Sequence, residues 1–125
     1  MLEVLQDMPA GVIGFEAVGR VSSDDYDEVL EPAVRAAAEQ GGEIRLVYVF
    51  GDRFEGYSPG AAWEDTKLGV GNFRSWERTA LVSDHDWAEH LVKALGWMMP
   101  GKARHFPLGA LAEAVAWAGE RSEPD

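Results

Sequence analysis

The pattern with the most specific chemistry is Gly-Tyr-Ser-Pro-Gly at residues 56–60, which reads G-x-S-x-G. In many hydrolases this pattern places a nucleophilic serine on a sharp turn between a strand and a helix, with acidic and histidine partners later in the chain. Ser58 would be the nucleophile here. Candidate partners follow in the required order, namely Asp84, Asp86, His90 and His105.

Three features of the surrounding sequence argue against catalysis by Ser58. The apolar run Ile44–Phe50 predicts a strand, and Gly51 to Glu55 separate that strand from the motif, whereas a hydrolase elbow turns sharply. Pro59 has no N–H, although the residue after the nucleophile normally donates to the oxyanion hole. A chain of 125 residues is also small for that fold. We therefore predict no catalytic residue and interpret the motif as a turn at a helix start, with Ser58 esterase activity kept as the last alternative.

The segment 84–90, Asp-His-Asp-Trp-Ala-Glu-His, contains side chains that bind metal ions. On a helix His85 and Glu89 share one face and Asp86 and His90 share another, so the two histidines diverge. No third histidine with ligand spacing is near them in the sequence. We predict a solvated helix start, with no metal site and no bound cofactor.

Tryptophan is abundant, with five residues in a chain of 125. The apolar stripe on the helix expected from Asp84 to about Met98 includes methionines, which adapt to irregular ligands. One interpretation is an ordinary core; the other is a site for a lipid or another small hydrophobic molecule between two helices. The predicted ligand-binding residues are Phe54, Tyr57, Trp63, Phe73, Trp87, Leu91, Leu95, Met98 and Met99.

A helix expected from Gly60 to Asn72 would cover this space. It contains Gly69 and Gly71, each costing about 1 kcal/mol relative to alanine in a helix interior. We predict that it is the least stable helix and opens to admit a guest. It carries the motif Trp63, Asp65 and Lys67. The alternative interpretation of Asp65 and Lys67 is an ion pair at the surface or at a hinge.

Hydrophobic patterning predicts the order β-β-α-β-α-β-α-β-α, an α/β fold with a mostly parallel five-stranded sheet and four helices. The connection between the first and second strands is too short for a parallel crossover, so the first strand should pair antiparallel with the second. The strands are expected at Leu2 to Gln6, Val12 to Gly19, Ile44 to Phe50, Arg78 to Ser83 and Lys102 to Phe106.

Local signals set the expected helix boundaries. Ser22 or Ser23 should cap the first helix, and Pro32 should kink or split it because proline cannot donate to the residue four back. Gly41-Gly42 should end it. Ser83 with Asp86 resembles a capping box for the next helix. The last helix, Pro107 to Glu120, should turn Leu111, Ala114, Val115 and Trp117 inward.

Charge and cysteine content exclude several functions. The net charge is −11, which disfavours nucleic acid and anionic membrane surfaces as partners. The chain has no cysteine, no stretch long enough for a membrane span and no signal peptide at its start, so we expect a cytoplasmic protein.

Several segments together resemble the SpoIIAA-like family of small bacterial proteins. They are G-x-V-S-S-D-D-Y-D around Tyr26, I-R-L-V-Y-V from Ile44, A-A-W-E-D-T-K from Ala61, R-T-A-L-V-S-D-x-x-W from Arg78 and R-x-F…A-x-x-W from Arg104 to Trp117. The resemblance spans residues 2 to 119. It implies a STAS-like fold, the fold of anti-sigma-factor antagonists, with an architecture similar to CRAL-TRIO lipid-binding domains, and it implies no established activity.

In STAS antagonists the loop before the second helix carries a phosphorylatable hydroxyl in a D-S-S-G or D-S-T-G context. The corresponding residues here are Tyr57, Ser58, Pro59 and Gly60, so proline replaces the second hydroxyl position and tyrosine replaces the aspartate. A phosphate on Ser58 would suit a helix N-terminus. Ser58 is thus a phosphoswitch candidate whose context departs from the pattern.

We expect a single STAS-like domain over residues 1–120, followed by a polar tail at 121–125, and no enzymatic activity. The first hypothesis is binding of a lipid or small hydrophobic ligand. The alternative is a regulatory module that binds a protein partner or forms a homodimer through the same helix face.

Overall fold

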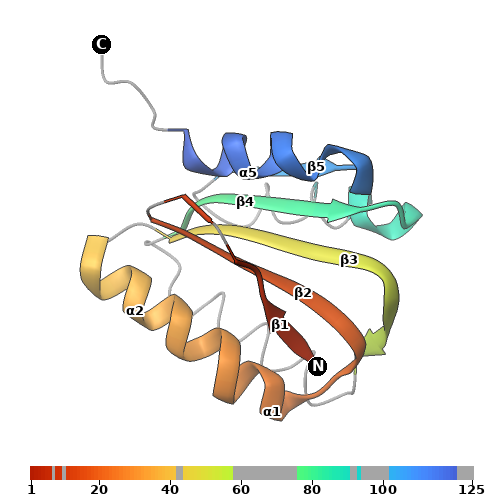
Figure 1. Cartoon of the computed structure of the whole chain (residues 1–125), viewed down its shortest axis with the longest axis horizontal. Coiled ribbons are helices and arrows are strands. Elements are labelled where there is room, and N and C mark those ends of the chain that lie inside the picture. The colour runs from red at the N-terminus through yellow and green to blue at the C-terminus, as the bar shows by residue number, and fades with distance from the viewer. Residues whose placement is uncertain are drawn as a thin grey trace.

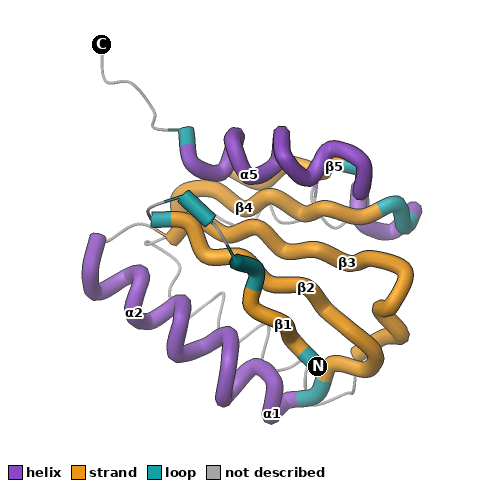
Figure 2. The backbone as a smooth tube through the Cα atoms, in the orientation of Figure 1, coloured by secondary structure: helices purple, strands orange, loops and turns teal. Residues whose placement is uncertain are grey.

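The computed structural model describes residues 1–6, 8–9, 11–41, 44–57, 76–90, 93 and 102–120. They form a five-stranded sheet in the order β1-β2-β3-β4-β5, with β1 antiparallel to β2 and the other pairs parallel (Figure 2). This confirms the predicted fold class. The strands are β1 (Leu2–Val4), β2 (Val12–Val21), β3 (Ile44–Tyr57), β4 (Trp76–Ser83) and β5 (Lys102–Phe106).

The described residues contain three helical segments rather than the four predicted. The first is continuous through α1 (Ser23–Asp25), the π-helical turn η1 (Tyr26–Leu30) and α2 (Glu31–Gly41). The second includes residues 86–90 and 93, and the third joins the 3₁₀ turn η3 (Leu108–Ala110) to α5 (Leu111–Gly119). The helix predicted from Gly60 to Asn72 lies outside the described residues.

Strand β3 is buried on both faces, as its continuous apolar run predicts. Ile44, Leu46, Tyr48 and Phe50 belong to the cluster that packs against α2, whereas Val47 and Val49 belong to the cluster that packs against α5. Figure 1 shows α2 and α5 on opposite sides of the sheet. Successive residues of a strand point to opposite faces, so one strand contributes to two cores.

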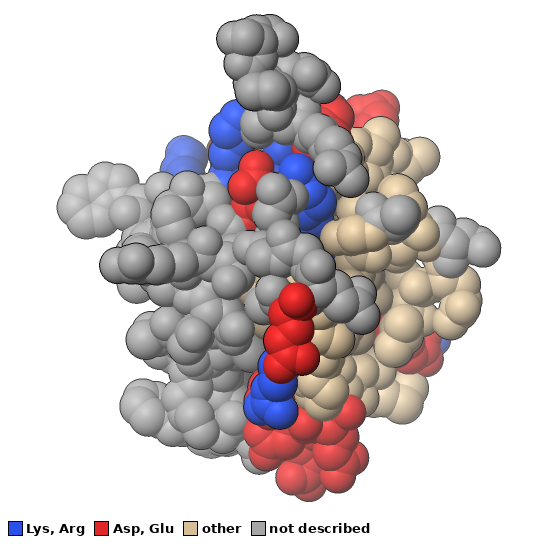
Figure 3. Space-filling view, turned by 90° about the vertical axis from the view of Figure 1, so that its left-hand side faces the viewer, with Lys and Arg blue, Asp and Glu red and all other residues tan. Residues whose placement is uncertain are grey.

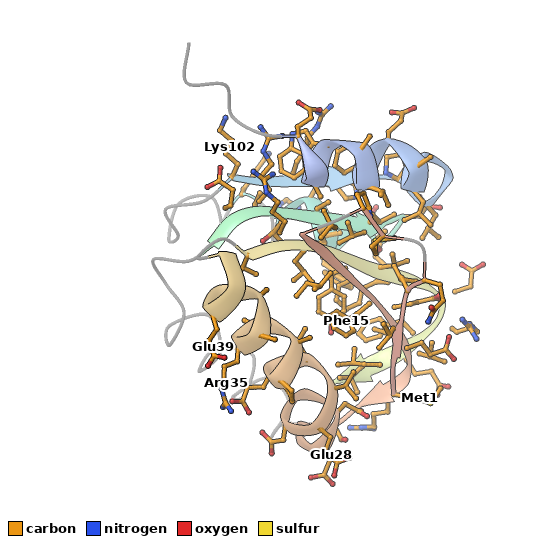
Figure 4. All side chains as sticks on the ribbon, turned by 60° about the vertical axis from the view of Figure 1, so that its left-hand side comes forward. Met1, Phe15, Glu28, Arg35, Glu39 and Lys102 are labelled. Carbon is orange, nitrogen blue, oxygen red and sulfur yellow. The ribbon has the colours of Figure 1, made fainter. Side chains whose placement is uncertain are left out.

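On the α2 face, Leu30 and Val34 are fully buried and pack with Phe15 of β2, which Figure 4 shows between the helix and the sheet. Ala88, from the helical residues 86–90, is fully buried in the same cluster. Within the described residues, α2 and the helical residues 86–90 therefore cover the same face of the sheet. The charged residues Arg35 and Glu39 lie on the outer side of α2 (Figure 4).

Helix α5 covers the other face through small residues. Ala114 and Ala118 are fully buried, and Val115 and Trp117 are half-buried against the same cluster. Leu111 was predicted to point inward, which is wrong, because its side chain is 37% exposed. The 3₁₀ turn before α5 places Leu108 against the sheet at this end instead.

The prediction that β3 ends at Phe50 is wrong, because the strand continues to Tyr57. Strand β2 is also longer than predicted and offers a partner, with Phe54 opposite Gly19 and Tyr57 opposite Val21. The register shifts along this stretch, and Gly56 adopts φ 128°, a value that side chains rarely tolerate. Ladder hydrogen bonds thus override the turn tendency of Gly51 and its neighbours.

The first helix begins at a reciprocal capping box. The Ser22 N–H donates to Asp25 Oδ2 at 2.7 Å, and the Asp25 N–H donates weakly to Ser22 Oγ at 3.4 Å. This confirms Ser22 as the cap. The π turn η1 ends at Leu30, two residues before Pro32, which cannot donate to the carbonyl four residues back, so the helix widens there instead of breaking.

Two buried arginines, Arg45 of β3 and Arg78 of β4, reach the C-terminal end of α5. Arg45 donates to the carbonyls of Ala118 (2.8 Å) and Glu120, and Arg78 donates to the carbonyl of Trp117 (2.8 Å) while its guanidinium carbon lies 4.9 Å from the Trp117 ring. Both arginines are 6% exposed. Their charges satisfy the final carbonyls and complement the negative end of the helix dipole.

Replacing Arg45 with methionine should lower the free energy of unfolding by about 2 kcal/mol, because buried carbonyls of α5 lose their donor. Urea unfolding measures this value. The control is Arg35→Met on the exposed side of α2, where Arg35 forms an ion pair with Glu31 one helical turn away. That variant should change stability by less than about 0.5 kcal/mol. Equal effects of the two variants would contradict the capping role of Arg45.

The capping box predicts a pH dependence. Burial tends to raise the pKa of Asp25, but hydrogen bonds from Ser22 and the nearby amino group of Met1 outweigh it and lower the pKa below its ordinary value of 3.8. A lowered pKa stabilises the folded state above that ordinary value, and this stabilisation disappears as the pH falls through the lowered pKa.

We therefore expect Asp25→Asn to be less stable than wild type by about 0.5–1 kcal/mol at neutral pH. The difference should shrink steadily below pH 3.8, because the wild-type carboxyl group is then also losing its charge. Urea unfolding at several pH values measures both, with the exposed Asp52→Asn as control. A difference that stays constant with pH would refute the assignment.

Candidate functional site

In open sheets of parallel strands, ligands bind at the carboxyl ends of the strands. At this edge β3 ends at Tyr57 and β4 ends at Ser83, and the chain then enters the helical residues 86–90. The two strands are neighbours, so residues far apart in the sequence meet here. Aromatic side chains of β3 and of the residues that follow β4 gather at this place.

We call five of these residues the aromatic cluster, namely Tyr48, Phe50, Phe54, His85 and Trp87. The ring of Phe50 stacks on Tyr48 at 4.4 Å and meets Phe54 and Trp87 edge-on, at 4.8 and 5.2 Å between ring centroids. Phe54 and Trp87 lie 6.1 Å apart. The His85 ring stacks on Trp87 at 5.5 Å and 17°. These are favourable aromatic geometries, so the rings support one another.

The cluster runs from the core to the surface. Phe50 is 1% exposed, whereas Trp87 is 38% exposed. The next residue, Ala88, is fully buried and holds the start of this helix against the sheet. Trp87 is therefore held in place by buried neighbours while more than a third of the residue is exposed to solvent.

A set of hydrogen bonds fixes the chain beside the cluster. The His85 N–H donates to Ser83 Oγ at 3.0 Å, and the Leu108 N–H donates to Asp84 Oδ1 at 3.0 Å. His105 Nε2 lies 2.6 Å from the carbonyl oxygen of Ser83. Ser83 thus binds the N–H two residues on, in place of the capping box predicted with Asp86. These bonds tie the end of β4 to β5 and η3.

The extent of β3 and the contacts of Asp84 and His105 change the assessment of the hydrolase motif. Because β3 reaches Tyr57, no loop separates the strand from Gly56–Gly60, and that objection to a nucleophile elbow was wrong. The objection from Pro59 stands, since it rests on the sequence. Two of the predicted triad partners, Asp84 and His105, are engaged with backbone groups. Ser58 itself lies outside the described residues.

Within the described parts of the chain, no group of three or more metal-binding side chains is close enough to hold an ion. His85 stacks on Trp87 and His105 contacts the Ser83 carbonyl, so these two histidines make separate contacts. None of the helices in the described ranges is both long and apolar enough to cross a bilayer.

The structure brings together Phe54 and Trp87, two of the predicted ligand-binding residues. Tyr57 lies at the end of β3, and its side chain is outside the description. Three cluster members were missed, Tyr48, Phe50 and His85; the alternation of residues 44–50 could have placed the first two on the face of Phe54. The remaining predicted site residues lie outside the described residues, namely Ser58, Trp63, Asp65, Lys67, Phe73, Leu91, Leu95, Met98 and Met99.

Comparison with known proteins identifies the fold and the family. A solved structure, an uncharacterized protein with a SpoIIAA-like fold from Shewanella loihica PV-4, superposes with a TM-score of 0.72 at 23% sequence identity, covering 94% of this chain and 92% of that one. No curated protein matches the sequence. The model of the SpoIIAA-like family matches residues 12–119. The chain therefore belongs to the SpoIIAA-like family.

Proposed function

We propose that this chain is a non-enzymatic, cytoplasmic STAS-like domain that binds a lipid or another small hydrophobic molecule at the aromatic cluster. The observation that carries the proposal is Trp87, which is 38% exposed although its ring touches the buried Phe50. A rigid aromatic surface at the carboxyl edge of parallel strands suits an apolar ligand.

The free energy gained by covering the exposed surface of Trp87 is large enough to contribute to ligand binding. A tryptophan buries about 150–250 Å² when fully covered, so its exposed fraction corresponds to roughly 80 Å² of ring surface. Covering that area would contribute about 2 kcal/mol to binding. This value is a large share of the free energy of a micromolar complex, about 8 kcal/mol.

The charges near the cluster select among apolar ligands. Asp84, Asp86 and Glu89 are exposed near Trp87 in the sequence, and the chain as a whole carries a charge of −11. An anionic head group held there would meet like charges. The proposed ligand is therefore a neutral amphiphile or a neutral ring compound rather than a fatty acid.

Replacing Trp87 or Phe54 with alanine should weaken binding of a neutral fluorescent lipid analogue by about tenfold or more, because the aromatic contact area is lost. Fluorescence titration measures the affinity, and native mass spectrometry of freshly purified protein detects any retained ligand. The matched control is Trp117→Phe, since Trp117 packs near Phe106 on the opposite face.

A fluorescent fatty acid of the same chain length should bind more weakly than the neutral analogue. Two results would contradict the proposal: no retained mass together with no binding of the neutral analogue, or equal losses in the Trp87 and Trp117 variants.

The second candidate is a regulatory module that binds a protein through the same helix face. Trp87 lies on a helix whose neighbouring residues Asp86, Glu89 and His90 are exposed, and tryptophan is enriched among residues that dominate protein interfaces. The phosphoswitch at Ser58 belongs to this candidate and stays a prediction, as does ester hydrolysis by Ser58.

Sedimentation separates the two candidates. If the face binds a second copy, the wild-type chain should dimerise with increasing concentration and Trp87→Glu should remain monomeric, because a charge at the centre of an apolar contact is not solvated. Ligand binding predicts a monomer at all concentrations. The Trp117→Phe variant should sediment like wild type in either case.

A further inference from the structure

We propose that the outer edge of β5 binds an acidic, extended segment of a partner protein as an added strand of the sheet. This site differs from the aromatic cluster in both chemistry and position. It rests on the sheet topology and on the charges of β5, and it does not depend on the proposed ligand.

Strand β5 is an outermost strand of the sheet. Its five residues pair with β4 along their whole length, from Lys102 opposite Arg78 to Phe106 opposite Val82. Within the described ranges no strand pairs with its other side. An unpaired strand edge presents a row of N–H and C=O groups that a further strand can use.

The edge is basic in a chain that is strongly acidic. Lys102 and Arg104 are both exposed, and as alternate residues of one strand they point to the same face. Within the described residues neither lies in ion-pair contact with a carboxylate. By contrast, the exposed cations Arg35, Arg53 and Lys93 each have such a partner, whereas the exposed Arg20 resembles the β5 pair in having none among the described residues.

Arg104 is also held in place. Its guanidinium carbon lies 4.8 Å from the ring centroid of Phe106, whose side chain is buried. This contact uses the face of the guanidinium group and none of its N–H donors. The donors remain able to bind carboxylates in the plane of the guanidinium group. Figure 4 shows Lys102 at the margin of the molecule, away from the acidic start of the first helix, where Glu28 is labelled. Figure 3 shows acidic side chains gathered at the lower end of the face in view, while its upper part carries both basic and acidic side chains.

The charges define the partner. Two copies of β5 paired side by side would bring cations against cations, which destabilises a ladder. A strand with carboxylates at alternate positions would instead place an acid beside Lys102 and another beside Arg104. On the opposite face it would meet Ala103 and His105, which are half-buried.

The test uses a fluorescein-labelled peptide of alternating glutamate and valine, a matched peptide with lysine for glutamate, and an acidic version whose central amides are N-methylated. The protein variants are Lys102→Glu with Arg104→Glu, and the equally charged control Arg35→Glu with Lys93→Glu. All four positions are exposed, so both variants should remain folded, with small and similar losses of stability from the broken surface contacts. Fluorescence anisotropy measures each affinity.

We expect the acidic peptide to bind wild type and the control, and to lose about tenfold or more in affinity for the β5 variant. The β5 variant should prefer the lysine peptide, N-methylation should abolish binding, and Trp87→Ala should leave peptide binding unchanged. This last result separates the site from the ligand site.

Several results would overturn the inference. Equal binding of the N-methylated peptide, or an equal loss in the control variant, would mean diffuse charge attraction without strand pairing. A wild-type dimer that the β5 substitutions dissolve would make a second copy the occupant. Failure of the acidic peptide to bind wild type would leave the edge without this function.

Discussion

Strand β3 must be covered on two sides, and the rest of the structure follows from that requirement. Its alternate residues enter two separate cores, one beneath α2 and one beneath α5. A single layer of helices would leave half of these side chains in water. The parallel strands advance in one direction across the sheet, and right-handed connections in such a sheet lie on one face. The described connecting helices occupy that face, so the opposite face falls to α5.

The two buried arginines fit this arrangement. Arg45 and Arg78 lie opposite each other on β3 and β4, at the edge where the parallel strands begin. Their guanidinium groups donate to the last carbonyls of α5. The small alanines of α5 let the helix lie close to the sheet, and the two arginines then bind its C-terminal end. The opposite edge, where the strands end, carries the aromatic cluster. At one edge of the sheet, therefore, the arginines bind α5, and at the other edge Trp87 stays exposed to solvent.

Much of this fold could be predicted from local signals. The alternation in residues 44–50, the Ser22 cap and the short connection after β1 each have one favourable structural outcome. The extension of β3 to Tyr57 could not be predicted, because it depends on pairing with residues of β2 that follow the expected end of that strand. The exposure of Leu111 depends on a 3₁₀ turn that brings Leu108 inward. Tertiary contacts decided both cases against local preference.

The candidate site was predicted only in part for the same reason. Phe54 and Trp87 were identified from residue type, but their contact requires β3 and β4 to be neighbours in register. His85 was considered only as a metal ligand, since a sequence does not show that its ring will stack on Trp87. The roles of Arg45 and Arg78 could not be predicted, because an arginine within a strand pattern usually points to solvent.

The placement of α5 has a consequence for synthesis of the protein. The strands and the first helix leave the ribosome before α5, so the nascent chain can complete one core while the opposite face of its sheet is still bare. That face presents Val47, Val49, Ala80 and Val82, an apolar patch of the kind that makes incompletely folded chains prone to aggregate. Leu5 and Met8 pack against this cluster as well, and α5 completes its cover with Ala114 and Ala118, after which Arg45 and Arg78 bind the last carbonyls of the helix.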